Sequence, residues 1–353
     1  MAPLVAYQPA KDETKSTAHS STGHNKESKP PKDEKRQFVV VGCVGDRSFQ
    51  QCKMVVETLA DRHPTSTSCH VLAYMPMEYY EFRQKLKKDY ETLIDALYPT
   101  VLILQIPTAS SLSALQSFPS LQPLQTFAKS TPNSTQKPTL MTALDLVTLA
   151  KDVYGFEDTR PGPLYIGLAM AAVVEEVQKR REGGSDFIYM DITSGTSNFG
   201  RLVFELYAST CPQTVSHFLR FITTTPQPTT NSQLSYKNTQ FTRVLPGGWI
   251  QGGEIIGQDG KVVVEQRLAD ENYIHPHAHR GTLSLANAGP HSAFSQFIIA
   301  LTAKPYFDKK YVCFGRLVDG EGTLRKMEGV SCVMERPVIA VEVAGCGVWK
   351  ADE

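Results

Sequence analysis

The sequence predicts a multi-domain chain in which a small α/β module precedes an all-β domain. Three observations lead to this prediction. The length of 353 residues is enough for two domains and their tails. Between residues 37 and 107, short apolar runs alternate with segments of helical periodicity, as in an α/β unit. From Asp186 onward, short strands with alternating apolar residues dominate, which indicates a sheet with one buried face.

The composition excludes several classes of protein. A hydrophobic content of 41% with 20% charged residues is typical of a globular protein. The net charge is +0, so charge gives no reason to expect a nucleic-acid or membrane-surface partner. No apolar run approaches the roughly 20 residues of a membrane span, and the N-terminus lacks the apolar core of a signal peptide. We therefore expect a cytoplasmic protein.

Two polar segments interrupt the predicted domains. Residues 1–35 contain almost no large apolar side chains, so they bury too little surface to offset the entropy of ordering. Residues 108–138 are dense in Ser, Thr, Pro and Gln, and they are longer than an ordinary connection. We expect a disordered tail and a flexible insertion, respectively.

The α/β module is predicted to span residues 36–160. A β-branched run at 38–42 predicts a buried strand, and residues 48–62 follow with helical spacing, capped by Ser48. A strand at 70–74, a charged helix at 78–97 and a strand at 101–107 come next. Further helices are expected at 142–154 and 161–181, the second within a helical linker, 161–185, that ends at a Gly-Gly pair.

This element order and the run FVVVGCVG at residues 38–45 resemble the thioredoxin-like or glutaredoxin-like module. Redox chemistry in such a module needs a cysteine of low pKa at the first strand-to-helix turn. That turn reads Gly45-Asp46-Arg47-Ser48, and Cys43 lacks a second cysteine at redox-motif spacing. An interaction module is therefore the expected role. The seven cysteines include no CxxC pair, which indicates a reducing compartment and no metal site.

Residues 186–349 carry seven motifs in a fixed order. They read GRLVFELY, CPQTVSHFLRF, FTRVLPGGWIQGG, ADENY, GTLSLANAGP, SQFIIAL and YFDKKYVCFGRLVDG. In this order the motifs resemble the cyclophilin family of peptidyl-prolyl cis-trans isomerases, over about residues 187–348. The resemblance implies an eight-stranded antiparallel β-barrel with two capping helices, at 212–222 and near 320–328.

The motif FTRVLPGGWIQGG contains one arginine and one glutamine among apolar residues, which suits a reaction without a covalent intermediate. Rotation about an X-Pro bond has a resonance barrier of roughly 20 kcal/mol. In the twisted transition state the proline nitrogen becomes a better hydrogen-bond acceptor, so a fixed guanidinium stabilises that state most. The resemblance implies that Arg243 is this catalytic arginine and that Gln251 orients it together with the substrate carbonyl.

The resemblance also implies a peptide-binding surface beside these two residues, with no metal and no cofactor. An apolar cup would hold the proline ring, a backbone ledge would pair with the peptide, and Gln296 would lie on the floor. Tyr306 stands where many members have tryptophan, so weak cyclosporin binding is expected. The implied binding residues are Phe241, Gly248, Trp249, Ala286, Asn287, Ala288, Gln296, Ile298, Tyr306, Phe307 and Tyr311.

Several of these positions depart from the family pattern. Gly248 replaces an aromatic residue and Trp249 follows it, a shift that in a regular strand turns the indole to the opposite face. Phe294 replaces a glycine and is expected to crowd the peptide groove, and Ile298 replaces a phenylalanine. The triplet His275, His277 and His279 is interpreted as part of a loop and not as a metal site.

Three functions remain open from the sequence. The first is a prolyl isomerase, of weak activity, that acts on proline-containing segments of client proteins. The second is a catalytically impaired prolyl-peptide-binding or structural protein of a ciliary or flagellar axoneme, with an axonemal or cytoskeletal partner. The third is a redox protein, against which the missing CxxC pair counts.

Overall fold

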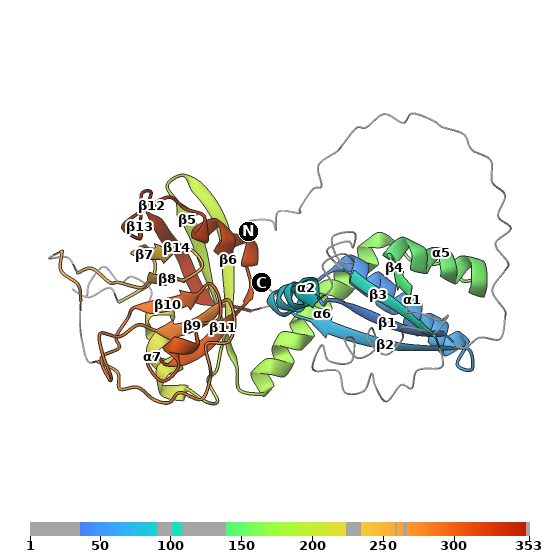
Figure 1. The fold of residues 1–353 in the computed structure, drawn as a ribbon, viewed down its shortest axis with the longest axis horizontal. Coiled ribbons are helices and arrows are strands. Elements are labelled where there is room, and N and C mark those ends of the chain that lie inside the picture. Colours follow the sequence, from blue (N-terminus) through green and yellow to red (C-terminus); the bar gives the residue numbers. More distant parts are fainter. Residues whose placement is uncertain are drawn as a thin grey trace. The chain divides into compact units, whose positions relative to one another are not determined.

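The computed structural model describes residues 36–89, 101–107, 139–223, 234–257, 260–263 and 267–350 (Figure 1). The tail at 1–35, the insertion at 108–138 and the end of the helix expected at 78–97 lie outside the described residues. Within the described ranges, no helix combines the length and the apolar character needed to cross a membrane.

The first part of the described chain is an α/β module with a four-stranded mixed sheet (Figure 1). Its strands are β1 (Arg36–Cys43), β2 (Thr67–Tyr74), β3 (Val101–Pro107) and β4 (Thr139–Met141), in the order β2-β1-β3-β4. β1 pairs in parallel with β2, whereas β3 is antiparallel to both β1 and β4. The nearly complete burial of β1 agrees with its unbroken apolar sequence.

Helix α1 (Arg47–Arg62) connects β1 to β2 and packs its apolar face against the sheet. The residue that caps it is Asp46, whose Oδ1 accepts a hydrogen bond from the Phe49 nitrogen at 2.9 Å. The prediction that Ser48 caps this helix is wrong because the helix begins at Arg47, so Ser48 already lies in its first turn and Asp46 occupies the cap position.

Three further helices lie among the described residues of this module. They are α2 (Pro76–Asp89), α5 (Ala143–Tyr154) and α6 (Gly162–Glu182). Helix α5 begins with a capping box between Thr142 and Asp145 and ends at Gly155, whose φ of 63° suits a residue without Cβ.

The C-terminal domain is built on one curled antiparallel sheet of eight strands (Figure 1). The order is β14-β5-β6-β11-β9-β10-β8-β7. The segment before β7 is joined to β14 by a bridge between Gln240 and Glu342, and by the Phe241 nitrogen, which donates to the Val341 oxygen at 2.8 Å. These contacts connect the two edges of the sheet, because β14 and β7 are its edge strands. The strands are β5 (Asp186–Ser194), β6 (Ser197–Leu206), β7 (Arg243–Leu245), β8 (Trp249–Gly252), β9 (Thr282–Leu285), β10 (Phe297–Ala300), β11 (Cys313–Asp319) and β14 (Val341–Val348).

Short elements complete this domain. Helix α7 (Pro212–Thr223) begins with proline, which needs no amide partner there, and it buries Phe218 and Phe221 against Tyr236. Helix α8 (Glu321–Glu328), the 3-10 turn η2 (Pro305–Phe307) and the hairpin of β12 (Cys332–Val333) and β13 (Arg336–Pro337) follow.

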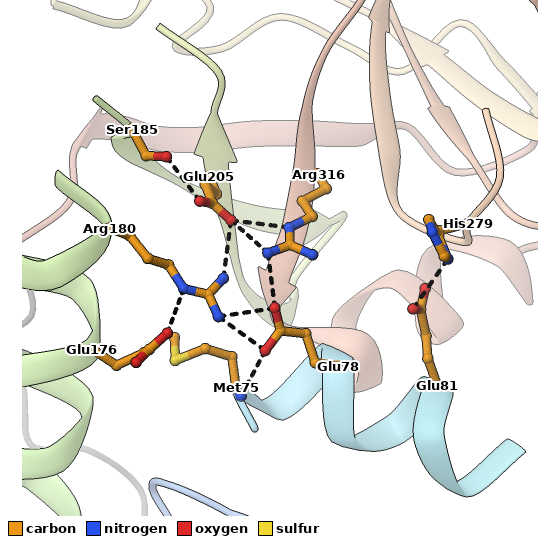
Figure 2. Close-up of polar contacts among 9 residues, drawn as sticks. All are labelled: Met75, Glu78, Glu81, Glu176, Arg180, Ser185, Glu205, His279 and Arg316. Carbon is orange, nitrogen blue, oxygen red and sulfur yellow. Dashed lines mark hydrogen bonds and ion pairs between the residues drawn. The ribbon is translucent and has the colours of Figure 1, made fainter. Parts of the chain in front are cut away.

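A network of ion pairs connects helix α2 with α6, β6 and β11 (Figure 2). Glu78 on α2 contacts Arg180 on α6 at 2.9 Å and Arg316 on β11 at 2.8 Å. Glu205 on β6 contacts the same two arginines, at 3.0 and 2.9 Å, and accepts a hydrogen bond from Ser185. Burial opposes its ionisation, but the two arginines outweigh that effect and lower the pKa of Glu205.

Candidate functional site

Strands β7 and β8 bring Arg243 and Gln251 directly opposite each other. The turn between them is tight: Gly247 has a φ of 65°, and the Gly248 nitrogen donates to the Leu245 oxygen at 2.8 Å. The turn therefore converts a separation of eight residues in sequence into a cross-strand pair.

A small apolar cluster lies beside this pair, and we keep for it the name cup that the expected proline site received. Ala286, Ile298 and Phe307 are buried in it, and Trp249 and Tyr311 pack against them. The Phe307 ring meets Trp249 and Tyr311 in edge-to-face contacts, with centroids 5.4 and 4.8 Å apart. Such walls suit a small apolar ring as ligand.

The expectation that the indole of Trp249 turns away from the cup is wrong. Gly248 belongs to the turn and not to the strand, so it does not enter the strand's alternation. Within β8, Trp249 and Gln251 are two residues apart and share a face, whereas Ile250 between them enters the main core. The cup therefore has an aromatic wall despite the glycine.

Phe294 does not crowd the groove, so that expectation is also corrected. Its side chain is only 8% exposed and belongs to the main core of the domain. It meets His217 and Phe221 of α7 in edge-to-face contacts, at 5.9 and 5.6 Å. The phenylalanine ring therefore packs under α7 and not in the groove, and its burial there is stabilising.

The guanidinium of Arg243 is held by a carboxylate. Glu335 Oε2 accepts from Nε at 2.7 Å and lies 2.5 Å from Nη2, with Arg243 47% and Glu335 36% exposed. The guanidinium carbon lies 5.6 Å from the centre of the Trp249 ring, so the arginine borders the cup. Glu335 is a site residue that sequence reasoning missed, because it stands 92 residues downstream in a hairpin without a recognisable motif.

Gln251 makes a different contact from the one that the family pattern implies. Its Nε2 donates to Gln296 Oε1 at 2.6 Å, and Gln296 Nε2 donates to Glu254 Oε1 at 3.2 Å. These two hydrogen bonds place the side chains of Gln251 and Gln296 side by side, as expected if both lie beneath the bound peptide. The carboxylate of Glu254, which accepts the second bond, was not singled out by the sequence.

The other candidate residues fall into three places. Phe241 is buried in the main core against Phe297, outside the cup. Tyr306 is 53% exposed and contacts Phe307 at the rim. The ledge residues Ala286, Asn287 and Ala288 follow β9, where the Ala286 nitrogen bonds to the Gln296 oxygen and the Ala288 nitrogen to Ser292 Oγ, both at 2.9 Å.

The three histidines of the HxHxH run have separate surroundings. His277 is buried beneath Phe307, with Nδ1 2.9 Å from Asp308 and Nε2 2.8 Å from Ser284. Burial lowers the pKa of His277, against the opposing effect of Asp308. The ring of His275 contacts that of Tyr207 at a tilt, and His279 lies 3.2 Å from Glu81. His277 thus supports the floor of the cup, a role that the sequence did not indicate.

Cys43 ends β1, next to the first strand-to-helix turn. Burial, the largest effect, raises the pKa of its thiol to about 11, although a backbone hydrogen bond from Gly45 opposes the rise. A redox cysteine needs the opposite shift. All seven cysteines are free thiols in this structure, and it is the raised pKa of Cys43 that counts against the redox alternative.

Comparison with known proteins gives a consistent result. The family model described as "Cyclophilin type peptidyl-prolyl cis-trans isomerase/CLD" matches residues 189–348. The human protein named "Probable inactive peptidyl-prolyl cis-trans isomerase-like 6" is 32% identical over 317 residues, which cover 88% of this chain and 91% of the human protein. The mouse protein of that name is 40% identical over 210 residues, covering 58% of this chain and 66% of the mouse protein.

Single-domain relatives match the C-terminal domain alone. "Peptidyl-prolyl cis-trans isomerase H" of Rhizopus delemar is 39% identical over 165 residues, which cover 45% of this chain and 92% of that protein. The curled sheet, the cross-strand pair of Arg243 and Gln251, and alignments with the isomerase-like 6 proteins that extend through the N-terminal module all agree. The chain therefore belongs to the cyclophilin family of peptidyl-prolyl cis-trans isomerases, and within it to the isomerase-like 6 group.

Proposed function

We propose that the C-terminal domain binds proline-containing segments of client proteins in the cup and isomerises their X-Pro bonds slowly. The observation that carries this proposal is the position of Arg243, at the edge of the cup beside Trp249 and opposite Gln251. A proline ring seated against Phe307 would bring its nitrogen toward the side of the cup that the guanidinium borders.

The catalytic part of the proposal follows from amide chemistry. As the X-Pro bond twists, the proline nitrogen regains its lone pair, and a guanidinium donor then interacts with it more strongly than in either planar form. Arginine keeps its charge at all physiological pH values, so this donor is always protonated. The reaction needs no nucleophile and no metal, which agrees with the residue types at the site.

A slow rate is proposed for two reasons. The donors of Arg243 already contact Glu335, so a substrate must compete for them. The mammalian relatives, moreover, carry the words "probable inactive" in their names. The alternative is a catalytically impaired peptide-binding protein. Comparing the X-Pro exchange rate of the Arg243→Ala variant with that of wild type distinguishes the two functions.

The test is an NMR exchange measurement on a short X-Pro peptide. We expect wild-type protein to accelerate cis–trans exchange measurably and Arg243→Ala to abolish most of that acceleration while the peptide still binds. Equal exchange rates with both proteins, together with retained binding, would leave a binding function only. Absence of peptide binding by wild-type protein would overturn the whole proposal.

We further propose that the N-terminal module is thioredoxin-like and serves in interaction. The parallel β1–α1–β2 unit, followed by an antiparallel β3–β4 pair and α5, supports this assignment. The raised pKa of Cys43 supports a role without disulfide exchange. An axonemal location and partner stay predictions of the sequence resemblance; recovery of the tagged protein in a detergent-extracted axoneme fraction is their test.

A further inference from the structure

The hairpin of β12 and β13 presents its turn to the strand that carries Arg243. The Val244 nitrogen donates to the Glu335 oxygen at 2.7 Å, so the main chain of the turn is fixed to β7 directly beside the arginine. The side chain of Glu335 then reaches the guanidinium through contacts of 2.7 and 2.5 Å. Main chain and side chain of the same residue thus hold the same strand.

The turn adopts a costly backbone conformation. Met334 and Glu335 have φ values of 49° and 67°, the left-handed region that non-glycine residues avoid. Two-residue hairpin turns of this kind favour Asn-Gly or Asp-Gly for that reason. Met334 is 96% exposed, so burial of its own side chain does not offset the cost. Strain of this sort persists where the surroundings enforce it, and it is common at functional sites.

Both contacts of Arg243 with the turn end on one oxygen, Glu335 Oε2. They occupy Nε and Nη2, the fork of donors that a carboxylate fits best and that a twisting prolyl amide would need. An exposed ion pair of this kind is weak enough to be broken by a bound peptide, yet it competes with that peptide in every encounter.

We propose that Glu335 is a positioning residue that holds the guanidinium of Arg243 in an ion pair and thereby lowers the isomerisation rate. This inference rests on the proposed function and deepens it by naming the residue that limits the reaction. The carboxylate acts through the arginine and has no contact with the reacting bond. Removing its charge should release the guanidinium without altering the cup.

The experiment compares wild-type protein with Glu335→Gln on the same X-Pro peptide. We expect kcat/KM to rise about fivefold, equivalent to about 1 kcal/mol, because an exposed pair contributes up to about that amount. The rise should appear in kcat, since the cup that binds the ground state is unchanged. In the double variant Glu335→Gln/Arg243→Ala the gain should vanish, because the carboxylate acts only through the arginine.

A matched control is available in the same domain. Arg201 and Asp191 form an exposed pair at 2.7 Å, with 47% and 38% exposure, almost the same as the pair at the site. Asp191→Asn removes an equal charge, so it should leave kcat/KM unchanged. An equal rise in both variants would mean that net charge is responsible and would overturn the inference.

Two further measurements keep the outcomes distinct. The Nε–Hε NMR signal of Arg243 should shift in Glu335→Gln and stay in place in Asp191→Asn. Glu335→Gly also relieves the left-handed strain, so it should be at least as stable as wild type and equally activated. Binding of the peptide with an unchanged rate in both Glu335 variants overturns this inference alone; no binding by wild type or variants removes the proposed function and this inference with it.

Discussion

Glu78 joins helix α2 to the cluster formed by Arg180, Glu205 and Arg316 (Figure 2), so its substitution by glutamine tests that contact selectively. Glutamine keeps the size of the side chain and removes its charge. The Oε1 atom contacts both Arg180 and Arg316, and Oε2 contacts Arg180 and the Met75 nitrogen. The substitution therefore weakens three charge-assisted contacts and one hydrogen bond to the start of α2.

The expected loss of folding stability depends on how deeply the ion pair is buried and on the contacts that the two arginines keep. Exposed ion pairs contribute about 0.2–1 kcal/mol, whereas removing one partner of a buried pair costs about 3–5 kcal/mol. The side chains of Glu78 and Arg180 are 22% and 15% exposed, which places the pair between these limits. Both arginines keep Glu205 as partner, so neither is left without a carboxylate. We expect a loss of about 2 kcal/mol, below the value for an orphaned charge.

Thermal unfolding and hydrogen exchange measure this effect. A loss of about 2 kcal/mol lowers the melting temperature of a chain of this size by about 4 °C. Amide exchange should accelerate in α2 and at its partners on β11, while the strands of the N-terminal sheet keep their protection. The control is Glu81→Gln, one turn along the same helix, because Glu81 pairs with the half-exposed His279, outside the cluster of Glu78, Arg180, Glu205 and Arg316 (Figure 2).

Two results would refute this reasoning. Equal melting temperatures for wild type, Glu78→Gln and Glu81→Gln would show that the contacts of Glu78 contribute nothing in solution. Equal losses for both variants would show that any negative charge on α2 suffices, so that the geometry around Arg180 is irrelevant.

Three further predictions follow from the site and the network. Trp249→Ala should weaken binding of an X-Pro peptide about tenfold in a calorimetric titration, because it removes one wall of the cup, whereas Tyr306→Ala at the rim should change affinity less than about threefold. Cys43 should react with iodoacetamide at pH 8 far more slowly than a free thiol, since its pKa is about 11; rapid labelling would restore the redox hypothesis. The lowered pKa of Glu205 stabilises the fold at pH values above the pKa of an unfolded glutamate, about 4.3, and this contribution is lost as the pH falls through the folded pKa. Denaturant titrations should therefore show the stability gap between wild type and Glu205→Gln at pH 7 closing below about pH 4, and a gap that widens in acid would contradict the assignment.

Local periodicity was enough to predict most of the architecture. The strand at β1 follows from its unbroken apolar run, which is buried along nearly its whole length, whereas the helix α1 and the hairpin of β5 and β6 follow from apolar spacing. The first turn of α1 was less predictable, since Asp46 and Ser48 are both good caps and a shift of two residues decides between them.

The face on which a side chain lies depends on where a turn ends, which sequence spacing alone does not give. The motif between Arg243 and Gln251 suggested that Trp249 leaves the cup, on the assumption that Gly248 is part of the strand. The hydrogen bond from the Gly248 nitrogen to the Leu245 oxygen makes it a turn residue, and the alternation starts one position later. Phe294 illustrates the same difficulty for a loop, because its direction is set by the space under α7 and not by its neighbours in sequence.

Whether the donors of a catalytic residue are free to contact substrate is harder to predict than which residue it is. Arg243 is identified by residues within ten positions of it, because the motif is local. Its ion pair with Glu335 joins segments 92 residues apart and depends on a strained turn whose sequence, Met334-Glu335, does not itself indicate a tight hairpin. A family motif thus establishes which donor would stabilise the transition state, whereas the charge that competes for that donor is determined by tertiary structure. Under the proposed function, the rate of prolyl isomerisation depends on that competition, so the carboxylate of Glu335 is a more informative target for mutation than the arginine itself.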